Sequence, residues 1–263
     1  MTNFAGYQIY GDMKIAIFQM NIEWQEPEKN MDAVRNWLQN IGNDIDIVVL
    51  PEMFNTGFSM TPEVDAEDMN GATVKWLISV AKLYGVAVVT SVAIRDKGVY
   101  FNRMMFVTPE GHIQWYDKRH LFRMGEENQH YMSGDKRVIV NYKGCRFLLQ
   151  VCYDLRFPVW SRNRNDYDAI IYVANWPEVR NAAWEILLKA RAVENSCFVI
   201  GANRTGKDLK VNYIGNSMII NYKGDIISTN TFDYVVADID LNKQYLFREK
   251  FPVHLDCDEF RLV

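Results

Sequence analysis

The chain has 263 residues, of which 49% are hydrophobic and 24% are charged, and its formal net charge is -4. This is the composition of an ordinary globular protein. The 29 basic and 33 acidic residues are spread along the chain without a basic block, which disfavours a nucleic acid partner. Apolar runs are strand-sized and stay below the ~18 residues of a membrane span, so we expect no membrane partner either.

Residues 1–12 indicate where the domain begins, and the cysteines indicate the compartment. Residues 1–12 lack the basic and apolar segments of a signal peptide, and we expect them to be an extension or an alternative start before a single domain over 13–263. The cysteines at 145, 152, 197 and 257 show no paired metal spacing. We therefore expect a reduced, cytoplasmic protein. We also expect that it needs no metal or organic cofactor.

The first half of the chain alternates strands and helices. Apolar residues at helical spacing predict two helices, and β-branched apolar runs predict the strands between them. A Pro109-Glu110-Gly111 turn then joins two further strands in a hairpin. In chain order we predict a strand at 14–19, a helix at 27–41, a strand at 45–50, a helix at 73–84, a strand at 86–94 and a hairpin of 102–107 with 112–116.

The second half repeats this order of elements without a readable sequence repeat. We predict a hairpin of 138–141 with 145–151, a strand at 169–173, a helix at 182–194, a strand at 197–202, a hairpin of 218–221 with 225–228 and a strand at 235–239. Helices alternating with strands and hairpins predict an α/β fold of mixed sheets covered by helices.

The end of the 145–151 strand is the most informative position. The apolar run Phe147-Leu148-Leu149-Gln150-Val151 delivers Cys152, and the chain then turns polar with Asp154 and Arg156. A lone cysteine is more often a small buried hydrophobe, which is how we interpret the other three. A thiol at a strand end beside charge is instead where a nucleophile would lie.

Two further strand ends carry charge. Glu52 follows an apolar strand, and Lys118 follows a hairpin strand. Taken singly, each is more simply a loop or surface charge. Together with Cys152 they form a specific set, because a cysteine nucleophile needs a base and a stabiliser of the oxyanion. None of the histidines at 112, 120, 130 and 254 lies at such a strand end, so a Cys/His pair is an alternative without support.

Three segments resemble the signature blocks of the nitrilase superfamily. They are Leu50-Pro51-Glu52, Tyr116-Asp117-Lys118-Arg119-His120-Leu121-Phe122 and Val151-Cys152-Tyr153-Asp154-Leu155-Arg156-Phe157-Pro158. The third block and Val173-Ala174-Asn175-Trp176-Pro177 are most similar to the omega-amidase (2-oxoglutaramate amidase) branch. The resemblance covers about 13–240 and implies a four-layer α-β-β-α sandwich with two mixed sheets.

The resemblance also implies the catalytic roles. Glu52 is the general base, Cys152 is the nucleophile, and Lys118 supplies positive charge to the oxyanion. The family has a second glutamate after the lysine block, for which we choose Glu127 over its neighbour Glu126. The implied reaction cleaves the ω-amide of a small dicarboxylate monoamide to acid and ammonia through a thioester on Cys152.

The implied substrate carries a carboxylate, which needs a cation. Arg156 is a candidate because a guanidinium holds a carboxylate through two parallel bonds, and the alternative is a structural ion pair with Asp154 or another acid. Tyr153 is expected to supply an oxyanion N–H, and Tyr153, Trp176 and Phe58 the pocket walls, although core packing is as good an account of Phe58.

Two other functions stay open. One is hydrolysis of another small amide, such as an N-carbamoyl amino acid. The other is a non-enzymatic binding protein, which the presence of all three catalytic residues disfavours. The resemblance also implies a homodimer or higher homo-oligomer that pairs through 158–160 and 181–194. Finally, Gly201–Lys207 resembles a P-loop, but Asp208 replaces its Ser/Thr and no helix is predicted to follow.

Overall fold

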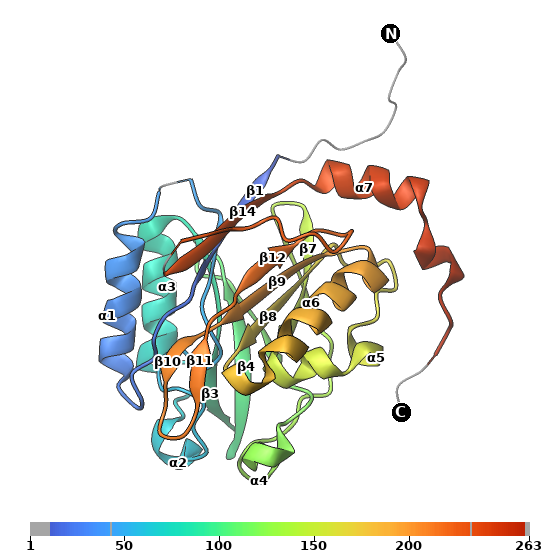
Figure 1. Cartoon of the computed structure of the whole chain (residues 1–263). Coiled ribbons are helices and arrows are strands. Elements are labelled where there is room, and N and C mark those ends of the chain that lie inside the picture. Colours follow the sequence, from blue (N-terminus) through green and yellow to red (C-terminus); the bar gives the residue numbers. More distant parts are fainter. Residues whose placement is uncertain (1–10, 43, 232, 261–263) are drawn as a thin grey trace.

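The computed structural model describes residues 11–42, 44–231 and 233–260. Two sheets pack face to face, and helices cover the outer face of each (Figure 1). The expected α/β class with two mixed sheets in a four-layer sandwich is confirmed. Residues 1–10, the greater part of the predicted extension, lie outside the described residues.

The larger sheet has seven strands in the order β13-β14-β1-β2-β3-β4-β5. Its three central strands β1, β2 and β3 are parallel, and the others pair antiparallel. The strands are β1 (Met13–Phe18), β2 (Ile47–Val49), β3 (Ala87–Asp96), β4 (Val99–Val107), β5 (Ile113–Asp117), β13 (Thr229–Asn230) and β14 (Tyr234–Ile239).

The smaller sheet has five strands in the order β12-β9-β8-β7-β6. Here β7, β8 and β9 are parallel, with an antiparallel strand at each edge. The strands are β6 (Ile139–Tyr142), β7 (Cys145–Val151), β8 (Ala169–Ala174), β9 (Phe198–Asn203) and β12 (Met218–Ile220), and a separate hairpin joins β10 (Thr205–Lys207) to β11 (Asn212–Ile214).

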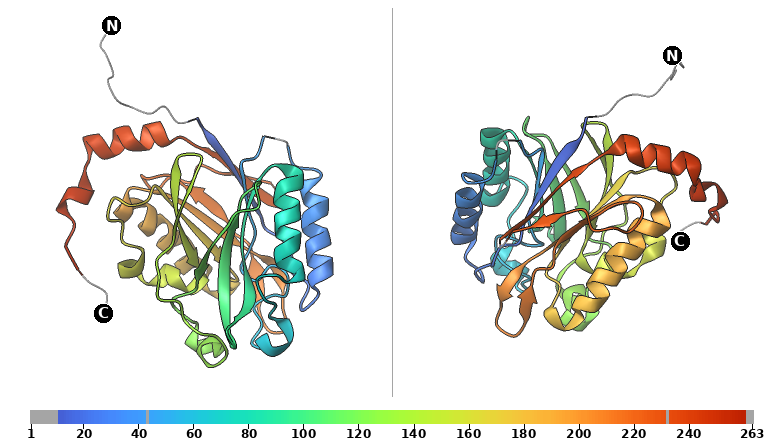
Figure 2. Two further views of the ribbon diagram at one scale, coloured as in Figure 1. Left: turned by 180° about the vertical axis from the view of Figure 1, so that it is seen from behind. Right: turned by 45° about the horizontal axis from the view of Figure 1, so that its top comes forward.

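Helices form the two outer layers. In both Figures 1 and 2, α1 and α3 lie side by side against the larger sheet, and α6 lies against the smaller one. The helices are α1 (Pro27–Leu38), α2 (Pro62–Asp65), α3 (Ala72–Tyr84), α4 (Glu127–His130), α5 (Pro158–Ser161), α6 (Asn181–Asn195) and α7 (Leu241–Lys250), with 3-10 turns η1 (Arg123–Gly125), η2 (Cys152–Arg156), η3 (Glu178–Arg180) and η4 (Val253–Asp256).

The alternation of side chains along the strands builds these layers. Ile15 and Ile17 of β1 join Phe147 and Leu149 of β7 in one buried cluster between the sheets. The intervening residues face outward, so that Phe18 packs with α1 and α3 residues and Leu148 packs with α6 residues. Successive side chains of a strand point to opposite faces, and both faces of each sheet are therefore buried.

Apart from the short helices α2, α4 and α5 and strand β13, which were not predicted, the structure differs from the predicted elements in three places. The second arm of the last predicted hairpin, 225–228, is not a strand, because it makes only a single bridge between Ile226 and Ile220. Helix α7 and the β10–β11 hairpin were not predicted. The hairpin occupies the end of the P-loop-like segment, where a nucleotide site would require a helix.

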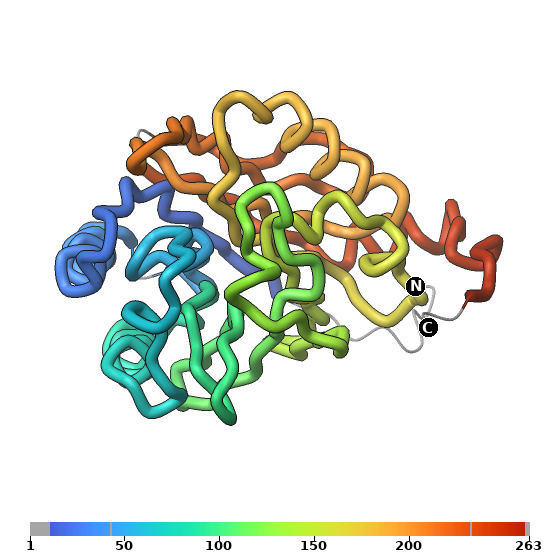
Figure 3. Tube along the Cα trace, turned by 90° about the horizontal axis from the view of Figure 1, so that it is seen from below, coloured from blue at the N-terminus to red at the C-terminus, as the bar shows by residue number. Residues whose placement is uncertain are grey.

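The carboxyl ends of the parallel strands meet at one end of the molecule. Figure 3 looks onto that end, and the loop after β5, in green, lies at its middle between segments of the two sheets. Residues that follow β2, β5, β7 and β8 are thereby brought together from distant parts of the chain.

Candidate active site

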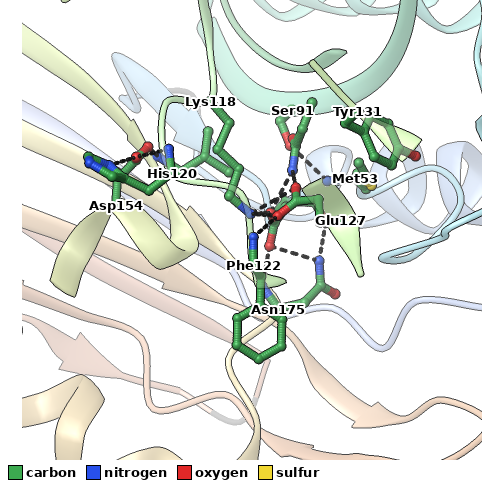
Figure 4. A network of polar contacts seen from close by, with 12 residues as sticks. Met53, Ser91, Lys118, His120, Phe122, Glu127, Tyr131, Asp154 and Asn175 are labelled. Carbon is green, nitrogen blue, oxygen red and sulfur yellow. Dashed lines mark hydrogen bonds and ion pairs between the residues drawn. The ribbon is translucent and has the colours of Figure 1, made fainter. Parts of the chain in front are cut away.

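Glu52 lies just after β2 and is fully buried. Its Oε1 accepts hydrogen bonds from Lys118 Nζ (2.9 Å) and Asn102 Nδ2 (2.7 Å). Its Oε2 accepts one from the backbone N–H of Asn175 (3.0 Å), the residue that follows β8. The carboxylate is thus held at both oxygens by three different segments of the chain. Figure 4 labels two of its partners, Lys118 and Asn175.

Lys118 follows β5, and its backbone N–H extends the pairing with β4 by bonding the Asn102 carbonyl oxygen (3.0 Å). Its buried ammonium donates to Glu52 Oε1 and to both Glu127 oxygens, at 3.0 and 2.9 Å. Glu127 Oε2 also accepts the Phe122 backbone N–H (2.6 Å). The neighbouring Glu126 is exposed and takes a positive φ of 61°, so Glu127 is the glutamate that contacts Lys118.

Cys152 is the first residue after β7 and begins the 3-10 turn η2. Its φ of 43° is left-handed, as is the φ of 45° at Met53, directly after Glu52. A left-handed non-glycine residue costs of order 1–3 kcal/mol and persists only where its surroundings enforce it. Strained backbone therefore lies at or beside both the thiol and the carboxylate, and the Cys152 side chain is half-buried.

The electrostatics of this cluster keep the thiol protonated and the lysine charged. Burial and then the Glu52 carboxylate raise the pKa of Cys152 well above its usual range, whereas Lys118 and the Asn175 backbone N–H lower it. Glu127 and Glu52 hold the pKa of Lys118 above its usual range against the effect of burial. Burial, helped by Glu52, raises the pKa of Glu127.

Aromatic side chains surround these polar groups. The Phe58 ring lies over the Lys118 ammonium, with Nζ 5.1 Å from its centroid. Tyr153 makes edge contacts with Phe122 (5.2 Å) and with Phe157 (5.1 Å), the residue after η2. Trp176 is buried and directly follows Asn175, and Tyr153 directly follows Cys152. The structure therefore places all three predicted wall residues near the cluster.

Arg156 is exposed and its guanidinium lies 5.0 Å from the centre of the Trp176 ring. The alternative of an ion pair with Asp154 is wrong, because the Asp154 carboxylate is occupied by Tyr116, His120 and the Val151 backbone. Within 11–260, apart from the two omitted positions, Arg156 forms no ion pair with any acid. A second cation, Arg123, lines a cavity of about 460 Å³ beside Tyr153.

The sequence matches a family model for carbon-nitrogen hydrolase over residues 14–249. The chain belongs to the carbon-nitrogen hydrolase family. This membership confirms the resemblance and the expected enzyme class, a hydrolase of carbon–nitrogen bonds. Nitrilase-superfamily proteins are also among the solved structures that share the fold.

Three relatives define its place in the family. The chain is 43% identical to omega-amidase YafV of Escherichia coli K12, over 95% of this chain and 98% of that protein. It is 32% identical to 2-oxoglutaramate amidase of Bacillus subtilis 168, over 92% and 96%. The crystal structure of XC1258 from Xanthomonas campestris, a CN-hydrolase superfamily protein with an arsenic adduct in the active site, matches with a TM-score of 0.93 and 40% identity, covering 96% of this chain and all of that one.

Two asparagines of this carbon-nitrogen hydrolase were missed from the sequence. Asn102 donates one Nδ2 group to both Glu52 and Glu127, and Asn175 holds Glu52 through its backbone and its side chain. Asn175 follows a predicted strand, so the strand-end argument that selected Glu52 would have found it. Asn102 lies within a strand and carries no such signal.

Other kinds of site find no support in the described part of this hydrolase. It contains no cluster of three or more His, Cys, Asp or Glu side chains that would hold a metal ion. It also has no helix long and apolar enough to cross a membrane. The alternative of a Cys/His pair gains nothing, since His120 Nδ1 bonds Asp154 instead, at 2.7 Å.

Proposed function

We propose that the chain hydrolyses the ω-amide of a short dicarboxylate monoamide, of the 2-oxoglutaramate or 2-oxosuccinamate type, to the acid and ammonia. The names of the two relatives support the substrate class. The observation that carries the mechanism is that the two oxygens of the Glu52 carboxylate have different partners. Lys118 and Asn102 occupy Oε1, while Oε2 bonds the Asn175 N–H, and both Glu52 and the Asn175 backbone N–H act on the pKa of Cys152.

The first half-reaction forms a thioester. As Cys152 Sγ bonds the amide carbonyl carbon, Glu52 Oε2 takes the thiol proton, which is needed because the thiol is protonated at neutral pH. The developing oxyanion is stabilised by the Lys118 ammonium and by the Tyr153 backbone N–H. When the carbon–nitrogen bond breaks, Glu52 returns the proton to nitrogen, and ammonia leaves.

The second half-reaction restores the enzyme. Glu52 takes a proton from a water molecule while the water oxygen attacks the thioester carbon. The carbon–sulfur bond then breaks, the acid leaves, and the proton on Glu52 returns to Cys152. Glu127 acts through Lys118, because its two oxygens hold the ammonium in place.

A homodimer or higher oligomer remains a prediction.

Ammonia release tests the nucleophile. We expect a Cys152→Ala variant to release no ammonia above background from 2-oxoglutaramate, whereas Cys257→Ser, which changes a half-buried cysteine elsewhere, retains wild-type kcat. Equal release by Cys152→Ala and wild type would end the proposal. A panel that includes an N-carbamoyl amino acid distinguishes the alternative substrate, and no turnover of any amide would favour a binding protein.

The carboxylate contact is tested by comparing two arginines. We expect Arg156→Ala to raise KM for the acid amide by about 10–100-fold, the value of a hydrogen bond to a charged group, with little effect on a neutral amide of equal length. Arg123→Ala, which removes one of the two arginines that line the neighbouring cavity, is the matched control. If Arg123→Ala raises KM and Arg156→Ala does not, the carboxylate lies in that cavity instead.

A further inference from the structure

Asp154 is a fully buried carboxylate that the reaction above does not use. Among the described residues no lysine or arginine pairs with it. Four donors surround its two oxygens instead. Oδ2 accepts from the Tyr116 hydroxyl (2.8 Å) and the Val151 backbone N–H (2.9 Å), and Oδ1 from the backbone N–H (3.0 Å) and Nδ1 (2.7 Å) of His120. A buried charge is tolerated only when it is hydrogen-bonded as completely as this.

These donors come from the two segments that carry Lys118 and Cys152. Tyr116 and His120 lie two residues before and after Lys118, and Val151 lies directly before Cys152. Asp154 itself is in η2, two residues after the cysteine. Its Oδ1 therefore holds the lysine segment, while its Oδ2 holds both the lysine segment and the end of β7. Figure 4 shows Asp154 and His120 to one side of the Lys118 contacts.

The surrounding groups make this link rigid. The Tyr116 hydroxyl donates to Asp154 and accepts from the Arg119 backbone N–H (3.0 Å) and Trp160 Nε1 (3.1 Å). Burial and Asp154 raise the pKa of Tyr116 well above its usual range, so the phenol stays a donor. The His120 ring stacks on Phe157, with centroids 3.9 Å apart.

We propose that Asp154 is a positioning residue that sets the place of the Lys118 ammonium relative to the Cys152 thiol. The proposal rests on the proposed function, because it assumes that Lys118 and Cys152 act on the amide. Its physical basis is that a misplacement of reacting groups by about 1 Å costs about 10²-fold in rate. An asparagine at 154 would present an NH₂ group to one pair of donors and would release that pair.

A purely structural role is the competing account, and Asp168 provides the comparison. Asp168 is also a fully buried carboxylate with several donors, in this case Arg146 and Arg248. Arg146 lies at the start of β7, at the opposite end of the strand from Cys152, and Arg248 lies in α7, so neither donor is next to Lys118 or Cys152. Asp168→Asn should therefore lower the thermal midpoint but leave kcat per folded molecule unchanged.

The experiment compares Asp154→Asn, Asp168→Asn and wild type. We expect Asp154→Asn to lower kcat by about 10²-fold, with KM changed by less than about threefold, because only positioning is lost. Lys118 lowers the pKa of Cys152, so an ammonium that moves away should also slow the alkylation of Cys152 by iodoacetamide at mildly alkaline pH. The alkylation rate is measured by mass spectrometry of the Cys152 peptide. The proposal would be overturned if Asp154→Asn behaved like Asp168→Asn, with a lower thermal midpoint but wild-type kcat and a wild-type alkylation rate.

His120 variants keep the test informative if Asp154→Asn does not fold. His120→Asn retains a side-chain N–H donor in place of Nδ1, whereas His120→Ala loses it. We expect His120→Ala to lose more kcat than His120→Asn, and equal kcat in both would contradict the proposal. If wild type hydrolyses no amide, the proposed function fails, and the alkylation rates alone then decide whether Asp154 positions Lys118.

Discussion

A Glu52→Gln variant should lose about 10²–10⁴-fold in kcat and yet alkylate faster at Cys152 than wild type does. Glutamine cannot take the thiol proton, so amide turnover loses its base. The same change removes a negative charge that raises the pKa of Cys152. Glu52→Gln is therefore expected to lower kcat but to raise the alkylation rate of Cys152.

The pH dependence follows from the direction of the shift. Iodoacetamide reacts with the thiolate, whose fraction rises with pH until the pKa of the cysteine is reached. Because the pKa of wild-type Cys152 lies well above its usual range, its alkylation should keep rising into the alkaline region. In Glu52→Gln the pKa is lower, and the whole profile should move to lower pH.

The measurement is alkylation of the Cys152 peptide across pH, beside kcat for the same preparations. Glu126→Gln is the control, because Glu126 is exposed and should leave both quantities at wild-type values. Alkylation that slows in parallel with kcat would mean that Glu52 generates the thiolate before substrate arrives. That outcome contradicts a base that acts during the attack.

The strand ends explain why so much was readable from the sequence. Glu52 and Cys152 each follow an apolar strand and Lys118 follows a hairpin strand, and these three strand ends meet at one end of the fold. The order of the layers, by contrast, was predicted only from the resemblance to the nitrilase superfamily, since alternation along a strand does not say which element covers each face.

Helix α7 was missed because its sequence lacks an apolar stripe. Polar side chains hold it instead, since Gln244 and Arg248 donate to the backbone oxygens of Asp168 and Ser196. The same reasoning applies to Asn102 in the site, since it contacts Glu52, a residue 50 positions away in the chain. Contacts of this kind depend on the tertiary arrangement and leave no periodic signal.

Replacing Lys118 by methionine should be costly for stability as well as for kcat. With both carboxylates ionised, Glu52, Glu127 and Lys118 together carry one negative charge, and without the ammonium they carry two. Breaking a buried ion pair from one side typically costs about 3–5 kcal/mol in free energy of unfolding. The loss of an oxyanion donor alone should lower kcat by about 10²–10³-fold.

The destabilisation should depend on pH in a defined direction. Burial already raises the pKa of Glu127, and Lys118 opposes that rise, so the methionine variant should raise the pKa further. A carboxyl whose pKa is higher in the folded than in the unfolded state stabilises the fold when protonated, and this contribution is lost as pH rises. The difference from wild type in urea unfolding should therefore grow from mildly acidic to mildly alkaline pH.

A double variant separates stability from catalysis. Lys118→Met with Glu127→Gln returns the cluster to one negative charge, so we expect it to regain part of the lost free energy of unfolding while kcat stays as low as in Lys118→Met. Lys189→Met, which breaks an exposed pair with Glu185, is the control and should cost less than about 1 kcal/mol. If the double variant is no more stable than the single one, the two carboxylates do not repel each other. Lys118 then does not stabilise the fold by neutralising two like charges. If kcat recovers with stability, Lys118 supports the fold and takes no part in the reaction.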